Sequence, residues 1–460
     1  MQVASLIDGA WRDGGDLIPV LDKFNLTNAY DLPAATASDV TNSIDAAVAY
    51  IPPPPPERAA CLRRAADLIA ERRDAIRAAM VLEAGFPLKD ADGEINRALA
   101  TLRLSAEEAT RISGEMVPFD GAIQGRIGFT MRVPVGVVVA ITPFNAPLNT
   151  PCHKVGPALA AGNALILKPS EKTPGPAAYL GQALLDAGFP PDAVQVVQGG
   201  PDVAQALLAD PRPAFYAFTG STRVGAAIHA AVGLRRTQME LGSIASTIVL
   251  ADADIDAAAQ KCAGASFRKA GQVCTSIQTL YVAQEVHDAF LDRYVTAAKT
   301  LRAGDPLDPA TDVGPMISET AAEQVEGMLE GADIILGGTR DAAVISPTII
   351  ARPSERYLTQ EAFGPVAAVI PVADVGEAVA RVNATPYGLA TGLFTQDITT
   401  AFDAARQLDV GGVHINETSS SRVDLMPYGG VKESGFGQEG PRYAIREMTE
   451  ERLVTVSGLS

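Results

Sequence analysis

Two side chains in this sequence could carry out covalent chemistry on a carbonyl compound. Cys274 stands in the segment F-R-K-A-G-Q-V-C-T-S, a small and polar loop in which a substrate can reach a thiol. Glu240 stands upstream in M-E-L-G-S, at the end of an apolar stretch. A cysteine can attack a carbonyl carbon, and a carboxylate can activate the water that hydrolyses the resulting thioester. Either residue alone is a weak signal, but the pair favours catalysis through a thioester.

The size and charge of the chain limit the classes of partner. A chain of 460 residues exceeds the size at which one hydrophobic core usually keeps growing, so we expect two or more domains. With 47% hydrophobic and 20% charged residues, the composition is that of an ordinary soluble globular protein. The formal net charge of −17 argues against nucleic acid or an anionic membrane as a partner. It does not exclude an anionic small substrate, because a local group of arginines can override the overall sign.

The cysteines and the N-terminus predict the cellular compartment. The chain has four cysteines and no C-x-x-C pair, which indicates a reducing compartment without disulfide bonds. The first residues, M-Q-V-A-S-L-I-D-G-A-W, lack the basic start and the long apolar run of a signal peptide. The chain contains no run of about 20 apolar residues, which is the length needed to span a bilayer. We therefore expect a cytoplasmic protein that binds neither a membrane nor a metal.

The hydrophobic pattern along the chain predicts an α/β fold. Residues 57–85 and about 92–111 have the apolar spacing of amphipathic helices, and the prolines from Pro52 to Pro56 predict an extended spacer before them. The β-branched run 135–141 predicts a strand buried on both faces. The alternation that follows indicates a doubly wound parallel sheet, a second alternating region and a final strand. The helices are expected at 153–161, 176–187, 202–209 and 224–231, the strands at 164–167, 194–197, 214–218 and 452–457, and the second region at about 247–413.

Three further segments end predicted strands and carry polar groups. In F-T-G-S-T-R-V-G (218–225), Gly220 permits a sharp turn and Ser221 opens a helix whose N-terminus suits a pyrophosphate, although a plain strand–helix turn would look the same. This segment is not the G-x-G-x-x-G fingerprint. Lys168 and Glu171, in L-K-P-S-E, could hold the hydroxyls of a ribose or form a solvated ion pair. Asn145, in T-P-F-N-A-P, could stabilise an oxyanion or serve only as a turn residue.

These segments occur together and in an order that resembles the NAD(P)-dependent aldehyde dehydrogenase superfamily over nearly the whole chain. The matching segments are P-V-G-V-V-V-A-I-T-P-F-N, H-K-V-G-P-A-L-A-A-G-N, L-K-P-S-E-K-T-P, F-T-G-S-T-R-V-G, E-L-G-S, G-Q-V-C-T-S, Q-E-A-F-G-P-V and P-Y-G-G-V-K-E-S-G-F-G-Q-E-G. The later segment H-I-N-E-T-S-S-S-R-V-D-L-M-P-Y-G-G is similar to branches that oxidise lactaldehyde, sulfolactaldehyde, phosphonoacetaldehyde or, without phosphorylation, glyceraldehyde 3-phosphate.

The resemblance implies a fold of three parts and an oligomer. We expect a Rossmann-like, doubly wound cofactor domain, an α/β catalytic domain and a small β-arm for oligomerisation into a homodimer or homotetramer. The cofactor domain is expected to span 1–112 and 132–240, the catalytic domain 241–415 and the arm 113–131 and 435–460, with 416–434 returning to the cofactor domain and the substrate pocket.

The resemblance also implies catalytic roles. Cys274 matches the nucleophile, Glu240 the general base, and Asn145 with the backbone N–H of Cys274 the oxyanion hole. One departure is E-L-G-S-I-A-S-T in place of the commoner E-L-G-G-K, so Ser243 is expected to change the packing beside the cofactor.

The cofactor implied by the resemblance is NAD, with NADP as the alternative. Lys168 and Glu171 match the ribose-binding pair, Ser221 the pyrophosphate contact, and Glu361 with Phe363 the contacts to the nicotinamide. All positions that match cofactor contacts are Ile141, Thr142, Pro143, Phe144, Lys168, Ser170, Glu171, Gly200, Phe218, Thr219, Gly220, Ser221, Val224, Leu241, Glu361 and Phe363.

The substrate pocket implied by the resemblance is polar and poor in aromatic residues. Arg97 and Arg422 could pair with an anionic substrate tail, or each could be a structural charge. Some phosphonate and semialdehyde members carry an arginine directly before the nucleophile, where this chain has Val273. The expected substrate contacts are Arg97, Asn149, His153, Thr275 and Arg422, with Ala146, Thr150 and Val273 also on the pocket wall.

We therefore expect an oxidoreductase that converts a short polar or anionic aldehyde, of the lactaldehyde, sulfolactaldehyde or phosphorylated type, to the acid. Two alternatives stay open. A CoA-acylating relative would release the thioester to CoA and would not need Glu240. A non-catalytic structural derivative of the fold would need neither Glu240 nor Cys274.

Overall fold

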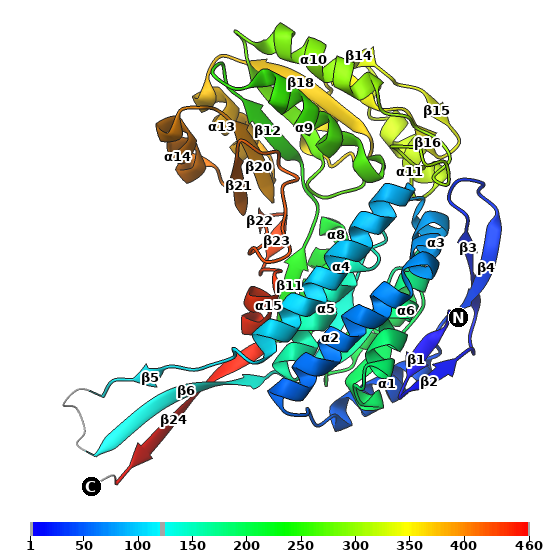
Figure 1. Cartoon of the computed structure of the whole chain (residues 1–460), viewed down its shortest axis with the longest axis vertical. Helices are drawn as coiled ribbons and strands as arrows, with labels where there is room; N and C mark the ends of the chain where they lie inside the picture. Colours follow the sequence, from blue (N-terminus) through cyan, green and yellow to red (C-terminus); the bar gives the residue numbers. More distant parts are fainter. Residues whose placement is uncertain (1–2, 120–124, 459–460) are drawn as a thin grey trace.

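The computed structural model describes residues 3–119 and 125–458 of the chain. Figure 1 shows two α/β lobes, one above the other, and a long β-arm that projects from the lower lobe. Each lobe is built on one mostly parallel sheet. No helix in these ranges is long and apolar enough to cross a membrane.

The sheet of the lower lobe is doubly wound, as the alternating pattern predicts. Its central strands are parallel, and β7 and β8 are buried along their whole length because helices cover both faces. In spatial order the strands are β2 (Ala10–Arg12), β1 (Ser5–Ile7), β9 (Val194–Val196), β8 (Ala164–Lys168), β7 (Val137–Ile141), β10 (Phe215–Thr219), β11 (Arg236–Glu240) and β23 (Gly435–Phe436).

Two apolar cores flank this sheet. One contains side chains from α2 (Pro55–Glu71), α3 (Arg73–Ala84), α4 (Leu88–Ala109), α5 (Asn149–Ala161) and α6 (Pro174–Asp186). The other contains side chains from α1 (Ala37–Ala49), α7 (Pro201–Ala209) and α8 (Thr222–Val232). Both cores extend over the carboxyl ends of the central strands, so the strand ends are held rigidly from both sides.

The structure corrects two expectations about the first helical region. The helix expected at 57–85 is two helices, because Arg72 leaves the helical conformation with φ −97° and ψ 12°. The prolines do not all form a spacer, since Pro55 and Pro56 are the first residues of α2. Proline suits this position because the N–H groups of the first helical turn have no partner within the helix.

The upper lobe has its own sheet and a single large core. The sheet is parallel except for the edge strand β14. In spatial order its strands are β14 (Asp333–Leu336), β17 (Thr348–Ala351), β18 (Val366–Val372), β13 (Ile277–Ala283), β12 (Ala245–Val249), β20 (Ala390–Phe394) and β21 (Gly412–Ile415). The helices of this lobe are α9 (Ile255–Phe267), α10 (His287–Lys299), α11 (Glu319–Glu326), α12 (Glu355–Thr359), α13 (Val375–Ala384) and α14 (Ile398–Gln407).

The arm is a three-stranded antiparallel sheet with a free edge. In spatial order it contains β24 (Thr449–Ser457), β6 (Arg126–Pro134) and β5 (Met116–Val117), and β24 pairs with β6 along its whole length. Three short pairs lie elsewhere: β3 (Leu17–Leu21) with β4 (Asn28–Pro33), β15 (Arg340–Asp341) with β16 (Val344–Ile345), and β19 (Tyr387–Gly388) with β22 (Val431–Lys432).

The arm differs from the expected boundary at residue 435. Strand β23 pairs with β11 in the sheet of the lower lobe, and α15 (Pro441–Glu447) packs against α5. The part of the arm that lies after residue 435 in the sequence therefore begins at β24. The wider division of the chain into a cofactor domain and a catalytic domain stays a prediction.

Candidate active site

Parallel strands bring the predicted cofactor segments to one edge of the lower sheet. Ile141, at the end of β7, lies in register beside Lys168, at the end of β8. Thr219, at the end of β10, lies beside Glu240, at the end of β11. These four carboxyl ends meet at one edge, which is where open α/β sheets bind their ligands.

A cleft at this edge is lined by many of the predicted cofactor residues. They are Pro143, Phe144, Thr219, Gly220, Ser221, Leu241, Glu361 and Phe363. The other predicted cofactor residues do not line this cleft but lie on the strand ends and helix starts of the same sheet edge. These are Ile141, Thr142, Lys168, Ser170, Glu171, Gly200, Phe218 and Val224.

The polar groups around the cleft fit a dinucleotide. Ser221 is the N-cap of α8, and its side chain makes no capping hydrogen bond. The first N–H groups of α8 are therefore open to an anion such as a pyrophosphate. The buried hydroxyl groups of Thr142 and Thr219 have no hydrogen-bond partner in the described part of the chain. Thr219 lines the cleft, so its hydroxyl and the first N–H groups of α8 are unused donors that a dinucleotide in the cleft could reach.

The predicted ribose pair forms an ion pair at the turn after β8. Lys168 Nζ lies 3.4 Å from Glu171 Oε2. Lys168 is 5% exposed, and this burial lowers the pKa of its ammonium group against the opposing charge of Glu171. The Glu171 side chain is 31% exposed. Its carboxylate therefore still faces solvent and can accept hydrogen bonds from a ligand.

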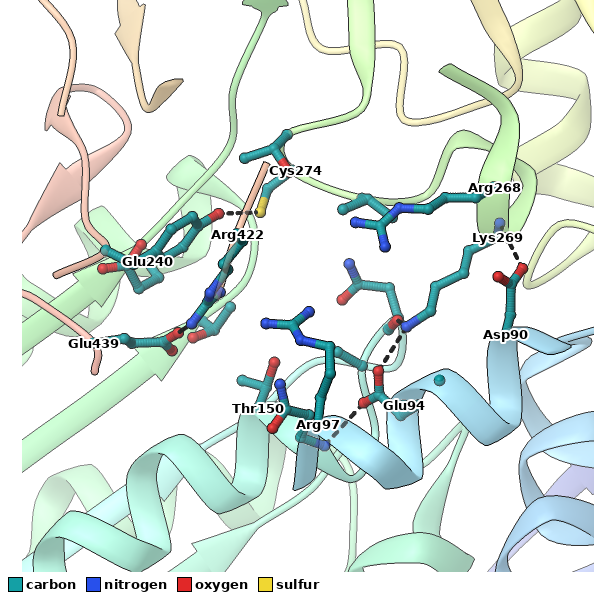
Figure 2. Close-up of a pocket in the computed structure, with 18 of the residues that line it drawn as sticks. Asp90, Glu94, Arg97, Thr150, Glu240, Arg268, Lys269, Cys274, Arg422 and Glu439 are labelled. Atoms are coloured by element: carbon teal, nitrogen blue, oxygen red, sulfur yellow. Dashed lines mark hydrogen bonds and ion pairs between the residues drawn. The ribbon is translucent and has the colours of Figure 1, made fainter. Parts of the chain in front are cut away.

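A cavity of about 250 Å³ adjoins the cleft and contains the predicted catalytic residues (Figure 2). Cys274, Glu240 and Asn145 line both the cavity and the cleft. The thiol, the carboxylate and the amide therefore stand at the junction of the two spaces. A group bound in the cleft and a group bound in the cavity would both meet Cys274.

The loop that carries the nucleophile begins with three consecutive left-handed residues. Lys269, Ala270 and Gly271 have φ values of 52°, 54° and 67°. For the two residues with side chains, this conformation costs roughly 1 kcal/mol or more each. A Cβ at Gly271 would lie 2.0 Å from the carbonyl oxygen of Gly364, so only glycine fits there. The chain reverses at this turn and leads Cys274 to the cavity.

Two neighbours favour the thiolate of Cys274 while burial opposes it. All these effects together raise the pKa of the Cys274 thiol to about 11, and burial is the largest of them. The hydroxyl of Tyr428, 2.9 Å from Sγ, and the guanidinium of Arg422 lower this pKa, whereas the charges of Glu361 and Glu240 raise it. Tyr428 donates its O–H to a thiolate, since the thiolate has no proton to give.

Glu240 is a buried carboxylate without hydrogen bonds. Its residue is 3% exposed, and neither carboxylate oxygen has a partner in the described part of the chain. Burial and then the charge of Glu439 raise its pKa well above the usual value, while Lys154 and Arg422 oppose the rise. A carboxylate with free oxygens and a raised pKa is suited to accept a proton from water.

Asn145 is held by the loop of the nucleophile. Its amide nitrogen donates to the backbone carbonyl of Gln272 at 2.8 Å. A side-chain amide has two N–H groups, so one is left for a substrate oxygen. The contact fixes the amide relative to Cys274, which follows Gln272 by two positions.

A buried ion cluster stands behind Glu240. Glu439 is 2% exposed and makes two ion pairs, with Lys154 Nζ at 2.9 Å and with Arg422 Nη2 at 2.5 Å. Lys154 also donates to Gln238 Oε1 at 2.8 Å. These cations hold the pKa of Glu439 well below its usual range despite its burial. The cluster provides fixed positive charge next to the thiol and the free carboxylate.

Residues 11–454 match the family model described as the Aldehyde dehydrogenase family. The chain belongs to the aldehyde dehydrogenase family.

Its relatives match along nearly their whole length. The chain is 42% identical to the 3-sulfolactaldehyde dehydrogenase of Priestia aryabhattai, over 99% of this chain and 98% of that protein. It is 36% identical to the lactaldehyde dehydrogenase of Methanocaldococcus jannaschii, over 98% of this chain and 99% of that protein.

Solved structures of the family superpose closely on this aldehyde dehydrogenase. Aldehyde dehydrogenase 21 of Physcomitrella patens, in complex with the reaction product succinate, matches with a TM-score of 0.95 and 35% identity, covering 98% of both chains. The glyceraldehyde-3-phosphate dehydrogenase GapN of Methanocaldococcus jannaschii, complexed with NADP, matches with a TM-score of 0.92 and 35% identity, covering 97% of this chain and 100% of that chain. The expected family, fold class and NAD(P)-dependent oxidation of aldehydes are confirmed.

The structure places most, but not all, of the predicted substrate residues at the cavity. Arg97, Ala146, Asn149, Thr150, Val273, Thr275 and Arg422 line it. His153 does not line it, because its ring is 1% exposed and lies behind Asp424, with Nε2 3.0 Å from Oδ1. The direct contact between His153 and substrate that the sequence predicted is therefore corrected.

The two predicted arginines are both paired with carboxylates. Arg97 Nη2 donates to Asp424 Oδ1 at 2.7 Å, and Arg422 pairs with Glu439. Lys269, which the sequence did not single out, pairs with Glu94 at 2.7 Å.

Sequence reasoning missed several residues of the cavity wall. They are Asp90, Glu94, Arg268, Lys269, Tyr428 and Glu439. Arg268, Lys269 and Tyr428 stand within segments that the sequence had already marked, F-R-K-A-G-Q-V-C and P-Y-G-G. The sequence therefore placed Arg268 and Lys269 near the nucleophile but did not show the direction of their side chains, and the contact of Tyr428 with Cys274 is seen only in the structure.

We predict that Tyr428→Phe slows alkylation of Cys274. The substitution removes a donor to the thiolate, worth about 1 kcal/mol, so the pKa of the thiol should rise by up to about one unit. At pH 8 iodoacetamide should then modify Cys274 up to roughly 10-fold more slowly, as measured by peptide mass spectrometry. The partly exposed Cys61 provides an internal control whose rate should not change. Unchanged or faster labelling of Cys274 would contradict the hydrogen bond.

Proposed function

We propose that this aldehyde dehydrogenase oxidises a short aldehyde that bears a hydroxyl or an anionic group, of the lactaldehyde, sulfolactaldehyde or phosphorylated type. The observation that carries the proposal is the state of Arg268 at the cavity wall. Arg268 makes no ion pair among the described residues, although carboxylates surround it. The names of the relatives, which include sulfolactaldehyde and lactaldehyde dehydrogenases, support the same substrate class.

The guanidinium of Arg268 keeps hydrogen-bonding capacity that an anion could use. Its Nη2 donates to Ser420 Oγ at 3.0 Å, and its buried Nε has no partner in the described part of the chain. Burial lowers the pKa of its guanidinium and the positive charge of Arg97 lowers it further, whereas the charges of Asp90 and Glu94 oppose this effect. A buried charge without a partner is costly, so an anionic substrate tail would relieve that cost.

The remaining wall of the cavity suits a short polar chain. Asn149, Thr150 and Thr275 are polar, and Ala146 and Val273 offer only small apolar surfaces. Tyr428 is the only aromatic residue among those that line the cavity in the described ranges. Long-chain or aromatic aldehydes would therefore find little apolar surface to bind.

The residues at the junction account for the first half of the reaction. The Cys274 thiolate attacks the aldehyde carbon, and the oxygen that becomes an alkoxide receives hydrogen bonds from Asn145 and from the backbone N–H of Cys274. A nicotinamide held in the cleft would supply the hydride acceptor for the oxidation of the aldehyde carbon. Glu361 and Phe363 line the cleft on the side expected to hold that ring. A thioester on Cys274 results.

Glu240 accounts for the second half. It draws a proton from a water molecule, whose oxygen attacks the thioester carbon. The carbon–sulfur bond then breaks, the carboxylic acid leaves, and Cys274 returns as a thiolate next to Tyr428 and Arg422. A CoA-acylating enzyme would not need this base, so turnover without added CoA is part of the proposal.

We predict that Arg268→Gln removes the advantage of anionic substrates. A charged contact is worth about 1.5–3 kcal/mol, so kcat/KM for sulfolactaldehyde should fall roughly 10- to 150-fold. The value for neutral lactaldehyde should change much less, because it has no group for the guanidinium. Steady-state formation of reduced nicotinamide, without CoA, measures both. An equal loss for the two aldehydes would mean that Arg268 has only a structural role, and it would contradict the proposal that the substrate is anionic.

We predict that NAD is preferred over NADP because of Glu171. Its half-exposed carboxylate can accept hydrogen bonds from both ribose hydroxyls and would repel a 2′-phosphate. Glu171→Gln should therefore raise kcat/KM for NADP relative to NAD by roughly 10-fold, equivalent to about 1.4 kcal/mol. The measurement is the ratio of the two values in wild type and variant. A wild-type ratio that favours NADP would overturn the prediction.

We also predict a dimer or a tetramer, because the arm presents an unprotected sheet edge. Within residues 3–119 and 125–458, strand β24 is unpaired on its outer side, and the arm exposes the apolar side chains of Ile127, Met131, Leu453 and Val456. Such an edge normally pairs with another chain. Light scattering at micromolar concentration should give twice or four times the chain mass, and Leu453→Asp should lower it. A wild-type monomer would contradict this.

A further inference from the structure

We propose that Asp424 determines the charge class of the substrate. By neutralising Arg97, it leaves Arg268 as the one cation of the cavity wall without an ion-paired carboxylate among the residues that the structure describes, so the cavity selects an aldehyde with one negative charge over an aldehyde with two. This inference rests on the proposed function, since it assumes that the substrate tail is anionic.

Asp424 is placed to cancel the charge of Arg97. It stands on the segment between β21 and β22 and is 8% exposed. Oδ1 accepts from Arg97 Nη2 at 2.7 Å, and Oδ2 accepts from Arg97 Nε at 3.4 Å. Asn149 Nδ2 also donates to Oδ1, at 3.1 Å. The carboxylate thus joins α4 and α5 to the loop that covers the cavity.

His153 does not add a second positive charge to this pair. Its Nε2 lies 3.0 Å from Asp424 Oδ1, so Nε2 carries the proton that the carboxylate accepts. Burial lowers the pKa of the ring, and the charge of Arg422 lowers it further. Its Nδ1 has no partner in the described part of the chain, which suits a neutral ring. One carboxylate therefore balances one guanidinium.

The other cations of the wall are balanced as well. Lys269 pairs with Glu94. Lys89 pairs with Asp312 outside the cavity. Arg422 and Lys154 both pair with Glu439, and the carboxylate of Glu240 lies beside this cluster.

Asp90, which also lines the cavity, makes no ion pair with Arg268. Its carboxylate instead accepts from the backbone N–H of Lys269 at 3.1 Å, and burial raises its pKa. Arg268 thus has no carboxylate within ion-pair distance among the described residues, although the charges of Asp90 and Glu94 raise the pKa of its guanidinium from farther away. Its guanidinium can still pair with one anion, and a second negative charge on the substrate would have no partner. In Figure 2 Arg97 rises from α4 while Arg268 comes from the segment before Cys274, and both line the same cavity.

Removing the charge of Asp424 should make Arg97 available. The Arg97 side chain is 29% exposed at the cavity, and its charge already lowers the pKa of Arg268, so the two guanidinium groups sense each other. An anion that reaches both would carry two negative charges to match them. Asp424→Asn keeps the shape of the side chain and one oxygen that can accept from Asn149. It removes the charge and replaces the oxygen that accepts from Arg97 Nε with an amide NH2 group, which cannot accept.

Three aldehydes with the same three-carbon skeleton test the proposal. Glyceraldehyde is neutral, 3-sulfolactaldehyde has one negative charge, and glyceraldehyde 3-phosphate has nearly two at pH 7.5. In the wild type, kcat/KM should be highest for 3-sulfolactaldehyde. In Asp424→Asn, the ratio of glyceraldehyde 3-phosphate to 3-sulfolactaldehyde should rise at least 10-fold.

A charge-conserving double variant provides the matched control. In Arg97→Gln/Asp424→Asn both members of the pair are removed. The ratio of kcat/KM for glyceraldehyde 3-phosphate to kcat/KM for 3-sulfolactaldehyde should then return to within about 3-fold of the wild-type value, because the two substitutions are coupled through the pair that they remove. A ratio that stays high would mean that Arg97 is not the released cation and would overturn the proposal. An equal loss for all three aldehydes in Asp424→Asn would also overturn it, by making Asp424 only a structural link.

The wild-type enzyme gives a second test that does not depend on the variants folding. The second pKa of a phosphate monoester is about 6, so glyceraldehyde 3-phosphate becomes largely monoanionic at pH 5.5. Its kcat/KM relative to 3-sulfolactaldehyde should rise several-fold between pH 7.5 and 5.5, and a flat ratio would contradict the proposal. If neither anion exceeds glyceraldehyde in the wild type, the anionic part of the proposed function fails and only a neutral hydroxyl aldehyde remains as substrate, which is a separate outcome.

Discussion

The active site depends on the burial of charge next to the catalytic residues. Glu439 is almost completely buried, and it can stay ionised only because Lys154 and Arg422 lie on either side of it. Breaking such a buried pair typically costs about 3–5 kcal/mol, because the remaining charge has no solvent. The ion cluster therefore fixes α5 to the loop over the cavity. That loop carries Tyr428, the hydrogen-bond partner of Cys274.

The same constraint explains how one site holds an activated thiol and a base. Burial raises the pKa of Cys274 and of Glu240, which alone would leave both groups protonated and inert. The positive charge of Arg422 opposes the rise of both pKa values and so favours the ionised form of each group. Asn145 is held to the nucleophile loop through Gln272. The cleft and the cavity meet at these groups, so a cofactor in the cleft and an aldehyde in the cavity would both lie next to the sulfur of Cys274.

Much of the fold could be predicted from the sequence because it depends on local patterns. The β-branched run of β7 is buried on both faces, as a parallel strand between two helical layers must be. The break at Arg72 could not be predicted, since E-R-R-D contains no residue that ends a helix. Pro55 and Pro56 were assigned to a spacer because a run of prolines has no helical signal, although proline is favoured in a first helical turn.

The candidate site was only partly predictable, for a related reason. Cys274 and Glu240 stand in segments whose order along the chain marks them. The charge state of the cavity depends instead on pairs that are distant in sequence, such as Arg97 with Asp424. The sequence pointed to Arg97 as a cation for substrate, whereas its carboxylate partner comes from a different segment of the chain. Arg268 became a candidate only once the structure assigned a partner to every other cation of the wall.

The most direct test of the central claim is the fate of the thioester when Glu240 is replaced. In Glu240→Gln, with NAD and the aldehyde that the wild type oxidises fastest, we expect a burst of about one reduced nicotinamide per active site, followed by a stall. Mass spectrometry should then find the acyl group on the tryptic peptide 270–293, which contains Cys274. An equal loss of burst and steady rate, with no acyl group on this peptide, would contradict the role of Glu240 as the base of thioester hydrolysis.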